Sequence, residues 1–409
     1  MRLLDAACAN DADMRARIEA LLSADAESGN CYLATPQSVI NILEPLHNKG
    51  LPVVAAGDLI AERYRLIRQL GEGGMGQVWL AEQTTPFQRH VALKLIKAGM
   101  HDEAVIRSFA SEQQSLQIMD HPAIAKVFDA GATSEGQPYF IMEYVPGLSI
   151  TAFCDLHRTS LRGCLEILIQ ACEGVQHAHQ KAVIHRDLKP ANILVVDVND
   201  KPAAKIIDFG LARIADAERR EEARQGQHTQ FFGTPGFISP EQVDPDVQEI
   251  DTRTDVYSLG VILYMLLTGL QPFEWAQAQE LPFDALLRRL REEDPRRPSA
   301  RLLADRNIAI EAAEARSTHT KTLVRELRRD LDWIAIKALQ RERERRYATP
   351  SELAADLRRY LRHEPVHARP PSTRYRIHKF VRRRASNVFA ALLNVLASGL
   401  NMTEAGYGR

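Results

Sequence analysis

The sequence of 409 residues has only five cysteines, and no two of them form a Cys-x-x-Cys pair. Their odd number and their spacing suggest neither a disulfide framework nor a zinc site, which fits a reducing, cytoplasmic compartment. The formal net charge is only -1, so the overall charge gives no argument for nucleic acid as a partner. A hydrophobic fraction of 45% nevertheless allows a large buried core.

The sequence also lacks a long uninterrupted apolar run. Acidic residues interrupt the first apolar positions, so we expect no secretory signal at the start of the chain. Near the other end, the apolar stretch 388–400 has 13 residues and includes Asn394 and Gly399. Because a membrane-spanning helix needs about 20 apolar residues, we expect no complete span there.

What the sequence does contain is a short stretch, 183–192, with three side chains suited to phosphoryl transfer. Asp187 can orient or accept the proton of an attacking hydroxyl, and Lys189 can hold a phosphate oxygen. Asn192 offers a neutral oxygen to a hard cation such as Mg²⁺. A His-Arg-Asp tripeptide alone is more often a solvated turn, so the motifs at other positions decide between the two interpretations.

A glycine-rich segment precedes this stretch. Gly71, Gly73 and Gly76 fit G-x-G-x-x-G, in which the missing side chains let backbone N–H groups lie close over phosphates. A dinucleotide-binding turn has the same spacing but continues into a helix, whereas Val78–Ala81 continues as a strand. The next strand-like run carries Val-Ala-Leu-Lys and ends at Lys94. This spacing favours Lys94 as an ATP phosphate ligand over an exposed lysine at a strand end.

A motif that begins with an aspartate follows the stretch 183–192, which we call the catalytic stretch. Asp208 opens Asp-Phe-Gly sixteen positions after Asn192, at the end of a strand-like run. A carboxylate at that point can bind Mg²⁺ that bridges two phosphates. A polar segment, 213–228, then leads to Ser-Pro-Glu, which ends at Glu241.

In their order and spacing these motifs resemble those of bacterial eukaryotic-like (Hanks-type) serine/threonine protein kinases, over residues 64–361. The resemblance implies an α+β, bilobal protein-kinase fold. Its small N-lobe would hold an antiparallel sheet with one helix, and its larger C-lobe would be mainly helical. We predict a helical N-terminal extension and linker (1–57), a kinase domain (58–361, with its N-lobe at 64–144 and its C-lobe at 148–361) and a basic, then apolar tail (362–409).

The resemblance also implies that ATP binds in the cleft under the glycine-rich loop, with Mg²⁺ or alternatively Mn²⁺. The catalytic residues would be Asp187, Lys189 and Lys94, and the metal ligands Asn192 and Asp208. The expected nucleotide-binding residues are Leu70, Gly71, Glu72, Gly73, Gly74, Met75, Gly76, Val78, Ala92, Lys94, Glu112, Met142, Glu143, Val145 and Leu194.

Three side-chain pairings follow from the same resemblance. Glu112, in the helix-like segment 102–119, lies where the partner of Lys94 is expected, although Glu103 is also available. Arg346 is expected to pair with Glu241. Asp255 could either cap the helix that it opens or tie that helix to the backbone of the catalytic loop.

Thr229 is the only residue with a side-chain hydroxyl in the segment 212–233. We therefore predict that Thr229 is the activating phosphorylation site and that its phosphate pairs with Arg186. Thr234 is expected to be a structural hydroxyl near Asp187.

These features predict an ATP-dependent protein serine/threonine kinase with protein substrates, no nucleic-acid partner, and homodimerisation as a route to trans-autophosphorylation. A pseudokinase scaffold is disfavoured because no chemical residue is missing. A small-molecule phosphotransferase is disfavoured by Arg346 and the Ser-Pro-Glu segment, which are typical of a peptide-binding platform.

The segment 362–384 carries eight Lys or Arg residues and one acidic residue, a local charge of +7. This layout resembles a juxtamembrane segment, so one hypothesis is a cytoplasmic protein with peripheral contact between its tail and anionic lipid. A soluble disordered or docking tail explains the same pattern equally well.

Overall fold

The computed structural model describes residues 54–73, 76–96, 119–134, 136–209, 235–242, 250–273, 292–370 and 379. The chain divides into two compact units, one made of residues 1–54 and 275–282 and the other of residues 55–274 and 283–409. Val54 is the one described residue of the first unit, so the fold below is that of the second unit.

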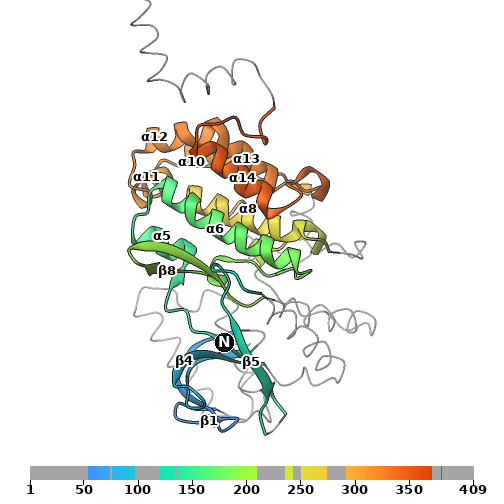
Figure 1. The fold of residues 1–409 in the computed structure, drawn as a ribbon. Helices are drawn as coiled ribbons and strands as arrows, with labels where there is room; N and C mark the ends of the chain where they lie inside the picture. Colours follow the sequence, from blue (N-terminus) through green and yellow to red (C-terminus); the bar gives the residue numbers. More distant parts are fainter. Residues whose placement is uncertain are drawn as a thin grey trace, which may run out of the picture. The chain divides into compact units, whose positions relative to one another are not determined.

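The first part of this unit is a six-stranded antiparallel sheet in the order β1-β2-β3-β4-β6-β5 (Figure 1). The central strand β4 pairs with β3 and β6, and its residues from Val91 to Ile96 are all buried. The strands are β1 (Leu59–Ile60), β2 (Tyr64–Gly73), β3 (Gly76–Gln83), β4 (Arg89–Ile96), β5 (Val127–Ala132) and β6 (Pro138–Glu143).

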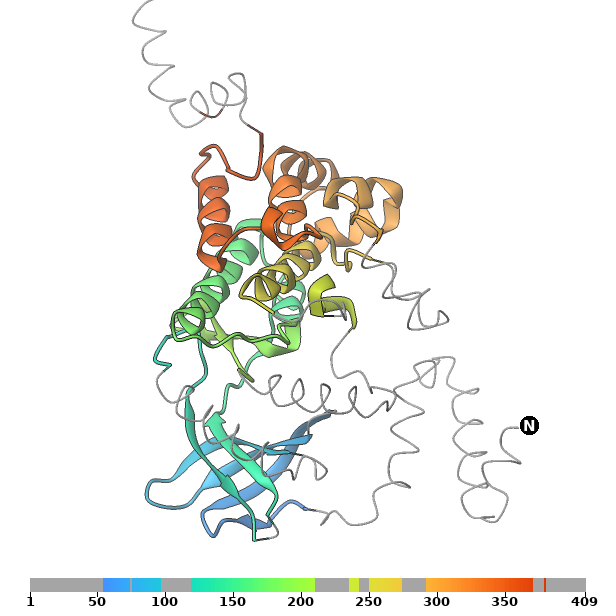
Figure 2. The same cartoon turned by 90° about the vertical axis from the view of Figure 1, so that its right-hand side faces the viewer.

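The second part is mainly helical. Helix α8 lies at its centre and is buried along almost its whole length, against α6, α13 and α14 (Figure 2). The α-helices are α5 (Ile150–Leu156), α6 (Leu161–Gln180), α8 (Arg253–Thr268), α10 (Pro298–Ala304), α11 (Arg306–Ala315), α12 (Thr320–Glu326), α13 (Asp332–Ala338) and α14 (Pro350–Leu361).

Shorter elements connect these helices. A three-stranded sheet consists of β7 (Leu148–Ser149), β8 (Ile193–Val198) and β9 (Lys201–Ile206). A π-helical turn, η4 (Leu327–Leu331), joins α12 to α13. The 3₁₀ turns are η1 (Pro190–Asn192), η2 (Pro235–Phe237), η3 (Pro240–Gln242) and η5 (Arg343–Arg345).

Local sequence signals explain several helix ends. The hydroxyls of Ser160 and Thr349 cap α6 and α14 by accepting hydrogen bonds from backbone N–H groups of the first turn. Gly269 ends α8 in a left-handed conformation with φ of 75°, as its position after the apolar run predicts.

One hydrophobic core connects the two parts. The backbone of Ile206 in β9 exchanges hydrogen bonds of 2.8 and 2.9 Å with Ala123 and Ala125, which precede β5. Met142 of β6 and Phe209 lie in the same buried cluster as the residues of α6 and α8. The predicted antiparallel sheet and helical lobe are therefore confirmed, whereas the predicted helix 102–119 lies outside the described residues apart from Met119.

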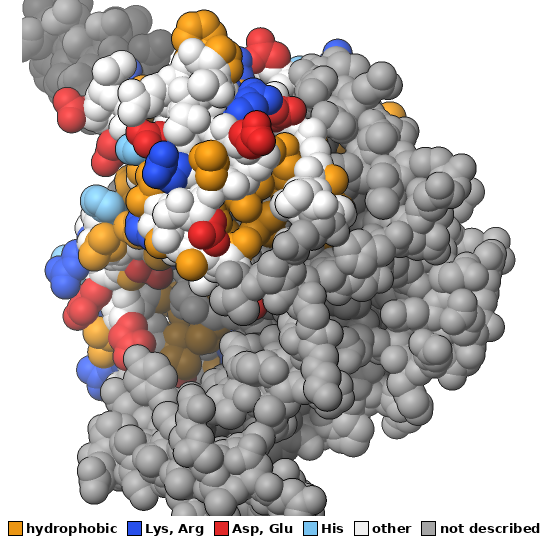
Figure 3. Space-filling model, turned by 90° about the horizontal axis from the view of Figure 1, so that it is seen from below, with side chains coloured by type: hydrophobic (Ala, Val, Ile, Leu, Met, Phe, Trp, Pro, Cys, Tyr) orange, Lys and Arg blue, Asp and Glu red, His pale blue; other side chains and the backbone are white. Residues whose placement is uncertain are grey.

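The surface on the side of the six-stranded sheet shows hydrophobic side chains among charged ones (Figure 3). The exposed large hydrophobic residues of this sheet and its turns include Leu59, Ile67 and Phe87. Single exposed apolar residues are normal on a protein surface, so we assign them no role.

Candidate functional site

A cavity of about 440 Å³ lies beside the part of β2 that precedes the glycine-rich turn. Strands β2, β3 and β4 contribute to it from one side, and the segment after β6 and strand β8 contribute from the other. Its lining residues are Arg68, Leu70, Gly71, Val78, Ala92, Met142, Glu143, Tyr144, Val145, Pro146, Gly147, Leu194, Ile207 and Asp208. The lining is largely apolar with two carboxylates, those of Glu143 and Asp208, which suits a planar ring with an anionic end held by metal and cations.

The glycine-rich turn joins β2 to β3, with Gly73 opposite Gly76 in the ladder. Gly76 has a φ of 142°, and a Cβ atom there would fall on the carbonyl oxygen of Leu95. A Cβ atom at Gly71 or Gly73 would meet nothing within 4 Å. Of these three glycines, Gly76 is the one that the strand packing itself requires.

Lys94 lies on β4 with its side chain only 7% exposed. Its Nζ atom lies 2.9 Å from Oδ2 of Asp208, which follows β9. A buried ammonium needs a nearby anion, because burial without one is costly. This ion pair brings the two predicted motifs together across 114 positions of sequence.

The catalytic stretch holds its three functional side chains in contact. Lys189 Nζ donates to Oδ2 of Asp187 at 2.8 Å. Asn192 Nδ2 donates to the backbone oxygen of Asp187 at 2.8 Å, and it lies 3.4 Å from the Asp187 carboxylate. Because the Asn192 amide nitrogen is engaged in this way, its side-chain oxygen remains the group that can ligate a cation.

Two residues at this site have left-handed backbones that non-glycine residues rarely adopt. Arg186 has a φ of 65° and Asp208 a φ of 63°. Each such conformation costs of order 1–3 kcal/mol and persists where surrounding contacts enforce it. The contacts of Asp255 and His185 supply that enforcement.

Asp255 on α8 is completely buried and anchors the catalytic loop. Its carboxylate accepts the backbone N–H groups of His185 at 2.9 Å and Arg186 at 2.8 Å, and it lies 2.7 Å from His179 Nε2. Burial opposes its ionisation, but the hydrogen bond and charge of His179 outweigh that effect and lower the pKa of Asp255. Of the two predicted roles, the structure shows the link to the catalytic-loop backbone.

His185 joins the catalytic stretch to the Asp-Phe-Gly motif. Its Nε2 atom lies 3.0 Å from the backbone oxygen of Ile207, and its ring lies 4.7 Å from that of Phe209. The backbone N–H of Ile207 also donates to the backbone carbonyl oxygen of Asn192 at 2.9 Å. These contacts hold Asp208 beside the segment that carries Asp187 and Asn192.

The Ser-Pro-Glu segment is fixed by a buried ion pair. Arg346 donates two hydrogen bonds of 2.6 Å to the Glu241 carboxylate, as predicted. Burial, the largest single effect, opposes the ionisation of Glu241, but the hydrogen bonds and charge of Arg346, together with hydrogen bonds from the backbone and from Thr254, lower its pKa. The next residue, Gln242, donates to the backbone oxygen of Arg186 at 2.8 Å, so this platform contacts the catalytic loop directly.

Asn192 and Asp208 supply oxygen donors from two adjacent segments. In the part of the chain that the structure describes, no group of three or more His, Cys, Asp or Glu side chains could hold a metal ion. Mg²⁺ is commonly bound by one or two protein oxygens together with substrate phosphates. The donor set therefore fits Mg²⁺ that arrives with a nucleotide better than a metal held by protein alone.

Comparison with known proteins decides the family. Residues 64–380 match the family described as the protein kinase domain. The chain belongs to the protein kinase family. The kinase fold and the family predicted from the motifs are thereby confirmed.

Two curated relatives of this kinase come from bacteria. Serine/threonine-protein kinase PknB of Mycobacterium tuberculosis is 36% identical over 318 residues, which cover 76% of this chain and 44% of PknB. Serine/threonine-protein kinase Pkn1 of Myxococcus xanthus is 39% identical over 234 residues, covering 56% of this chain and 32% of Pkn1. The chain thus spans less than half the length of these relatives.

Solved kinase structures share the fold. The PknI kinase domain of Mycobacterium tuberculosis matches with a TM-score of 0.52 and 23% identity, covering 75% of this chain and 100% of that domain. At this identity the likeness supports the fold alone.

The cavity of this kinase collects most of the predicted nucleotide-binding residues. Five of its lining residues were not predicted as site residues. Tyr144, Pro146 and Ile207 each adjoin a predicted residue, and Gly147 follows Pro146. The fifth, Arg68, belongs to β2 and has no sequence signal that points to the cavity. Glu72, Gly73, Gly76 and Lys94 are described but do not line it.

Glu143 has a side-chain role that sequence reasoning missed. Its carboxylate forms an ion pair of 2.9 Å with Lys205 on β9 and accepts the backbone N–H of Lys126 at 3.1 Å. Its side chain is therefore engaged in holding β6 to its neighbours, so any contact with a nucleotide would come from its backbone.

Several predicted residues lie outside the described part of the kinase: Gly74, Met75, Glu112, Thr229 and Thr234. The apolar stretch 388–400 lies outside it as well. Among the described residues, no helix combines the length and apolar character needed to cross a membrane.

Proposed function

We propose that the chain is a Mg-ATP-dependent protein kinase that phosphorylates serine and threonine hydroxyls. The observation that carries this proposal is the contact of Asp187 with Lys189 and Asn192, beside the Lys94–Asp208 ion pair and the cavity. Asp208 lines the cavity and pairs with Lys94, and the backbone hydrogen bond between Ile207 and Asn192 connects it to the segment that carries Asp187 and Lys189, which supports this proposal.

In this proposal the residues act mainly by positioning and electrostatics. Bound Mg-ATP would supply the γ-phosphoryl group and the charge neutralisation that lets a hydroxyl approach it. Asp187 orients the hydroxyl and accepts its proton, while Lys189 holds the transferring phosphoryl group. Lys94 holds phosphate oxygens of the nucleotide, and Asn192 and Asp208 hold the metal.

Lys189, two positions after Asp187, supports serine and threonine as the acceptors, because this arrangement is typical of that class. The Glu241–Arg346 ion pair supports a protein substrate, since it builds a rigid platform next to the catalytic loop. PknB and Pkn1 are both named as serine/threonine-protein kinases, which agrees with serine and threonine acceptors on proteins.

Regulation and location are further parts of the proposal. We propose phosphorylation of Thr229, with its phosphate paired to Arg186, as the activating event and a homodimer as the route to it. The protein would work in the cytoplasm, and the +7 charge of residues 362–384 supports peripheral contact with anionic lipid.

The test is transfer of labelled phosphate from Mg-ATP to the chain and to a generic basic protein. We expect label on serine or threonine for the parent, and a loss of roughly 10²–10⁴-fold for Asp187→Asn, because the group that orients the hydroxyl is changed. Lys94→Ala should also lose activity. Mass-spectrometric mapping should find Thr229 phosphorylated.

ATP binding, measured by a fluorescent nucleotide, serves as the control for folding of Asp187→Asn, and thermal unfolding serves as the control for Lys94→Ala, because Lys94 is itself proposed to hold the nucleotide. Binding without transfer to any protein would contradict the kinase proposal and support a pseudokinase scaffold. Transfer to small alcohols but not to proteins would support the small-molecule alternative.

A further inference from the structure

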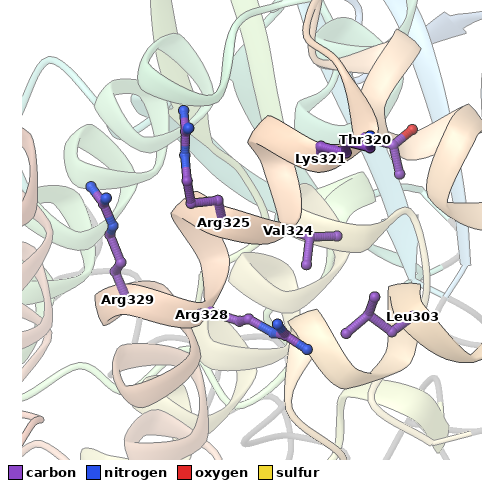
Figure 4. Close-up of a pocket in the computed structure, with 7 residues that line it drawn as sticks. All are labelled: Leu303, Thr320, Lys321, Val324, Arg325, Arg328 and Arg329. Carbon is purple, nitrogen blue, oxygen red and sulfur yellow. The ribbon is translucent and has the colours of Figure 1, made fainter.

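A second concave site lies in the helical part, away from the nucleotide cavity. It is a groove of about 430 Å³ between α10 and the continuous segment α12–η4 (Figure 4). We call it the basic groove. Its lining residues are Leu303, Thr320, Lys321, Val324, Arg325, Arg328 and Arg329.

The groove combines apolar and cationic side chains. Val324 is buried, whereas Leu303 is 54% exposed although it is a large hydrophobic residue. Arg325 and Arg329 extend in the same direction from their helix, while Arg328 extends towards Leu303 (Figure 4). An apolar strip is thus bordered by cations.

The cations lie close together in sequence and in space. Lys321, Arg325 and Arg329 follow one another at four-residue spacing, which places like charges on one helix face and is unfavourable. Within the described ranges, no carboxylate forms an ion pair with Lys321 or Arg325, and Arg328 has only a longer-range electrostatic interaction with Asp332. Arg329 has one acidic neighbour, Glu326, at 3.8 Å. A ligand with negative charges would relieve this repulsion.

The groove has a rigid wall. In the π-helical turn η4, Leu327 and Leu331 are completely buried, which fixes the backbone that carries Arg328 and Arg329. Arg369, beyond α14, donates to the backbone oxygen of Arg329 at 3.0 Å and holds the same turn from outside. π-helical turns are rare and are frequent at functional sites.

We infer that the basic groove binds an acidic segment of a protein substrate. Apolar side chains of an extended segment would contact Leu303 and Val324, and its carboxylates would pair with Arg325, Arg328 and Arg329. The site is concave, so a flat lipid surface cannot reach its floor, whereas a peptide can. The description of the partner as a substrate rests on the proposed kinase function.

Fluorescence anisotropy with the full chain tests the binding. The probe is a fluorescein-labelled nonapeptide that alternates glutamate and leucine, and the comparison peptide has glutamine in place of glutamate. We expect the acidic peptide to bind and the neutral one to bind at least tenfold more weakly. Arg325→Glu/Arg329→Glu should weaken binding by roughly tenfold or more, because two attractive pairs become repulsive.

The control variant is Arg306→Glu/Arg345→Glu, which makes the same charge change at two exposed positions outside the groove. Binding that falls equally in both double variants would overturn the groove as the site. Binding of phosphatidylserine vesicles that depends on Arg325 and Arg329, without peptide binding, would also overturn it.

Kinetics connect the groove to phosphorylation. A substrate that carries the acidic nonapeptide beside its acceptor serine should show a KM several-fold lower than one that carries the neutral peptide. In Arg325→Glu/Arg329→Glu this difference should vanish, with an unchanged rate on the neutral substrate. If the chain transfers no phosphate at all but still binds the acidic peptide through Arg325 and Arg329, the kinase proposal fails and the groove stands.

Discussion

The two motif glycines that face each other across β2 and β3, Gly73 and Gly76, differ in whether their position could accommodate a Cβ atom. Gly76 has a positive φ and no room for a Cβ atom beside Leu95, whereas Gly73 has open space and an ordinary φ. The G-x-G-x-x-G motif requires glycine at both positions, but only at Gly76 does the surrounding packing exclude a larger residue.

We therefore predict that Gly76→Ala lowers the free energy of unfolding by roughly 1–3 kcal/mol, because it combines backbone strain with a collision. It should also weaken binding of a fluorescent ATP analogue, since β3 must move. Gly73→Ala is the matched control and should change stability by about 0.5 kcal/mol or less. Thermal unfolding and nucleotide titration of the two variants check this, and equal losses would refute it.

Among the connecting elements, the segment that carries Glu241 is held by a buried ion pair with Arg346, beside a hydrogen bond of 2.8 Å from the Thr254 hydroxyl to the same carboxylate. Because the pKa of Glu241 is lowered in the folded state, its contribution to stability is present above its unfolded pKa of about 4.3 and is lost as the pH falls through its folded value. Acid should therefore weaken this contact below about pH 4.3.

Arg346→Met should cost about 3–5 kcal/mol at neutral pH, because it leaves a buried carboxylate without its partner. It should also reverse the local pH dependence: burial alone raises the pKa of Glu241, so the variant gains stability when that group is protonated. Arg345→Met changes an exposed neighbour and serves as the control. Urea unfolding at pH 7 and pH 4.5 measures both, and a parallel pH dependence of the two variants would contradict the assignment.

At the scale of the whole molecule, the described residues beyond α14, 362–370 and 379, pack against the helical part. Val366 is buried, and the backbone N–H groups of His367 and Ala368 donate to the buried Asp356 at 2.8 Å. Farther on, Lys379 lies 2.5 Å from Asp330 of η4 as a buried ion pair. The family match extends equally far, to residue 380.

Lys379→Met should lower the free energy of unfolding by up to about 3–5 kcal/mol, since it leaves the buried Asp330 with Arg369 alone, at 3.7 Å. The double variant Asp330→Asn/Lys379→Met should be more stable than Lys379→Met, because it removes the unpaired charge. Lys201→Met, at an exposed lysine, is the control. Urea unfolding measures the free energy of unfolding of each variant. If the loss in the double variant equalled the sum of the losses in Lys379→Met and Asp330→Asn, the two residues would not form a pair.

The sequence predicted the kinase family and the fold, because each motif is a short local pattern and each strand or helix has its own apolar periodicity. The Glu241–Arg346 pair was also predictable, since a known pattern specifies both residues. The contacts of Asp208 with Lys94 and of Asp330 with Lys379 were not predicted. The basic groove was also missed, because α10 and α12 meet through tertiary packing that leaves no repeat or spacing in the sequence.

Asp255 has a consequence for how the sequence can vary over evolutionary time. Its two oxygens serve three donors from two segments in a site without solvent. Asparagine would offer one acceptor in place of two, and glutamate would need room for a further methylene group. No other amino acid offers acceptors to all three donors. We therefore expect substitutions at His179 and His185 to be tolerated more readily during evolution than a substitution at Asp255.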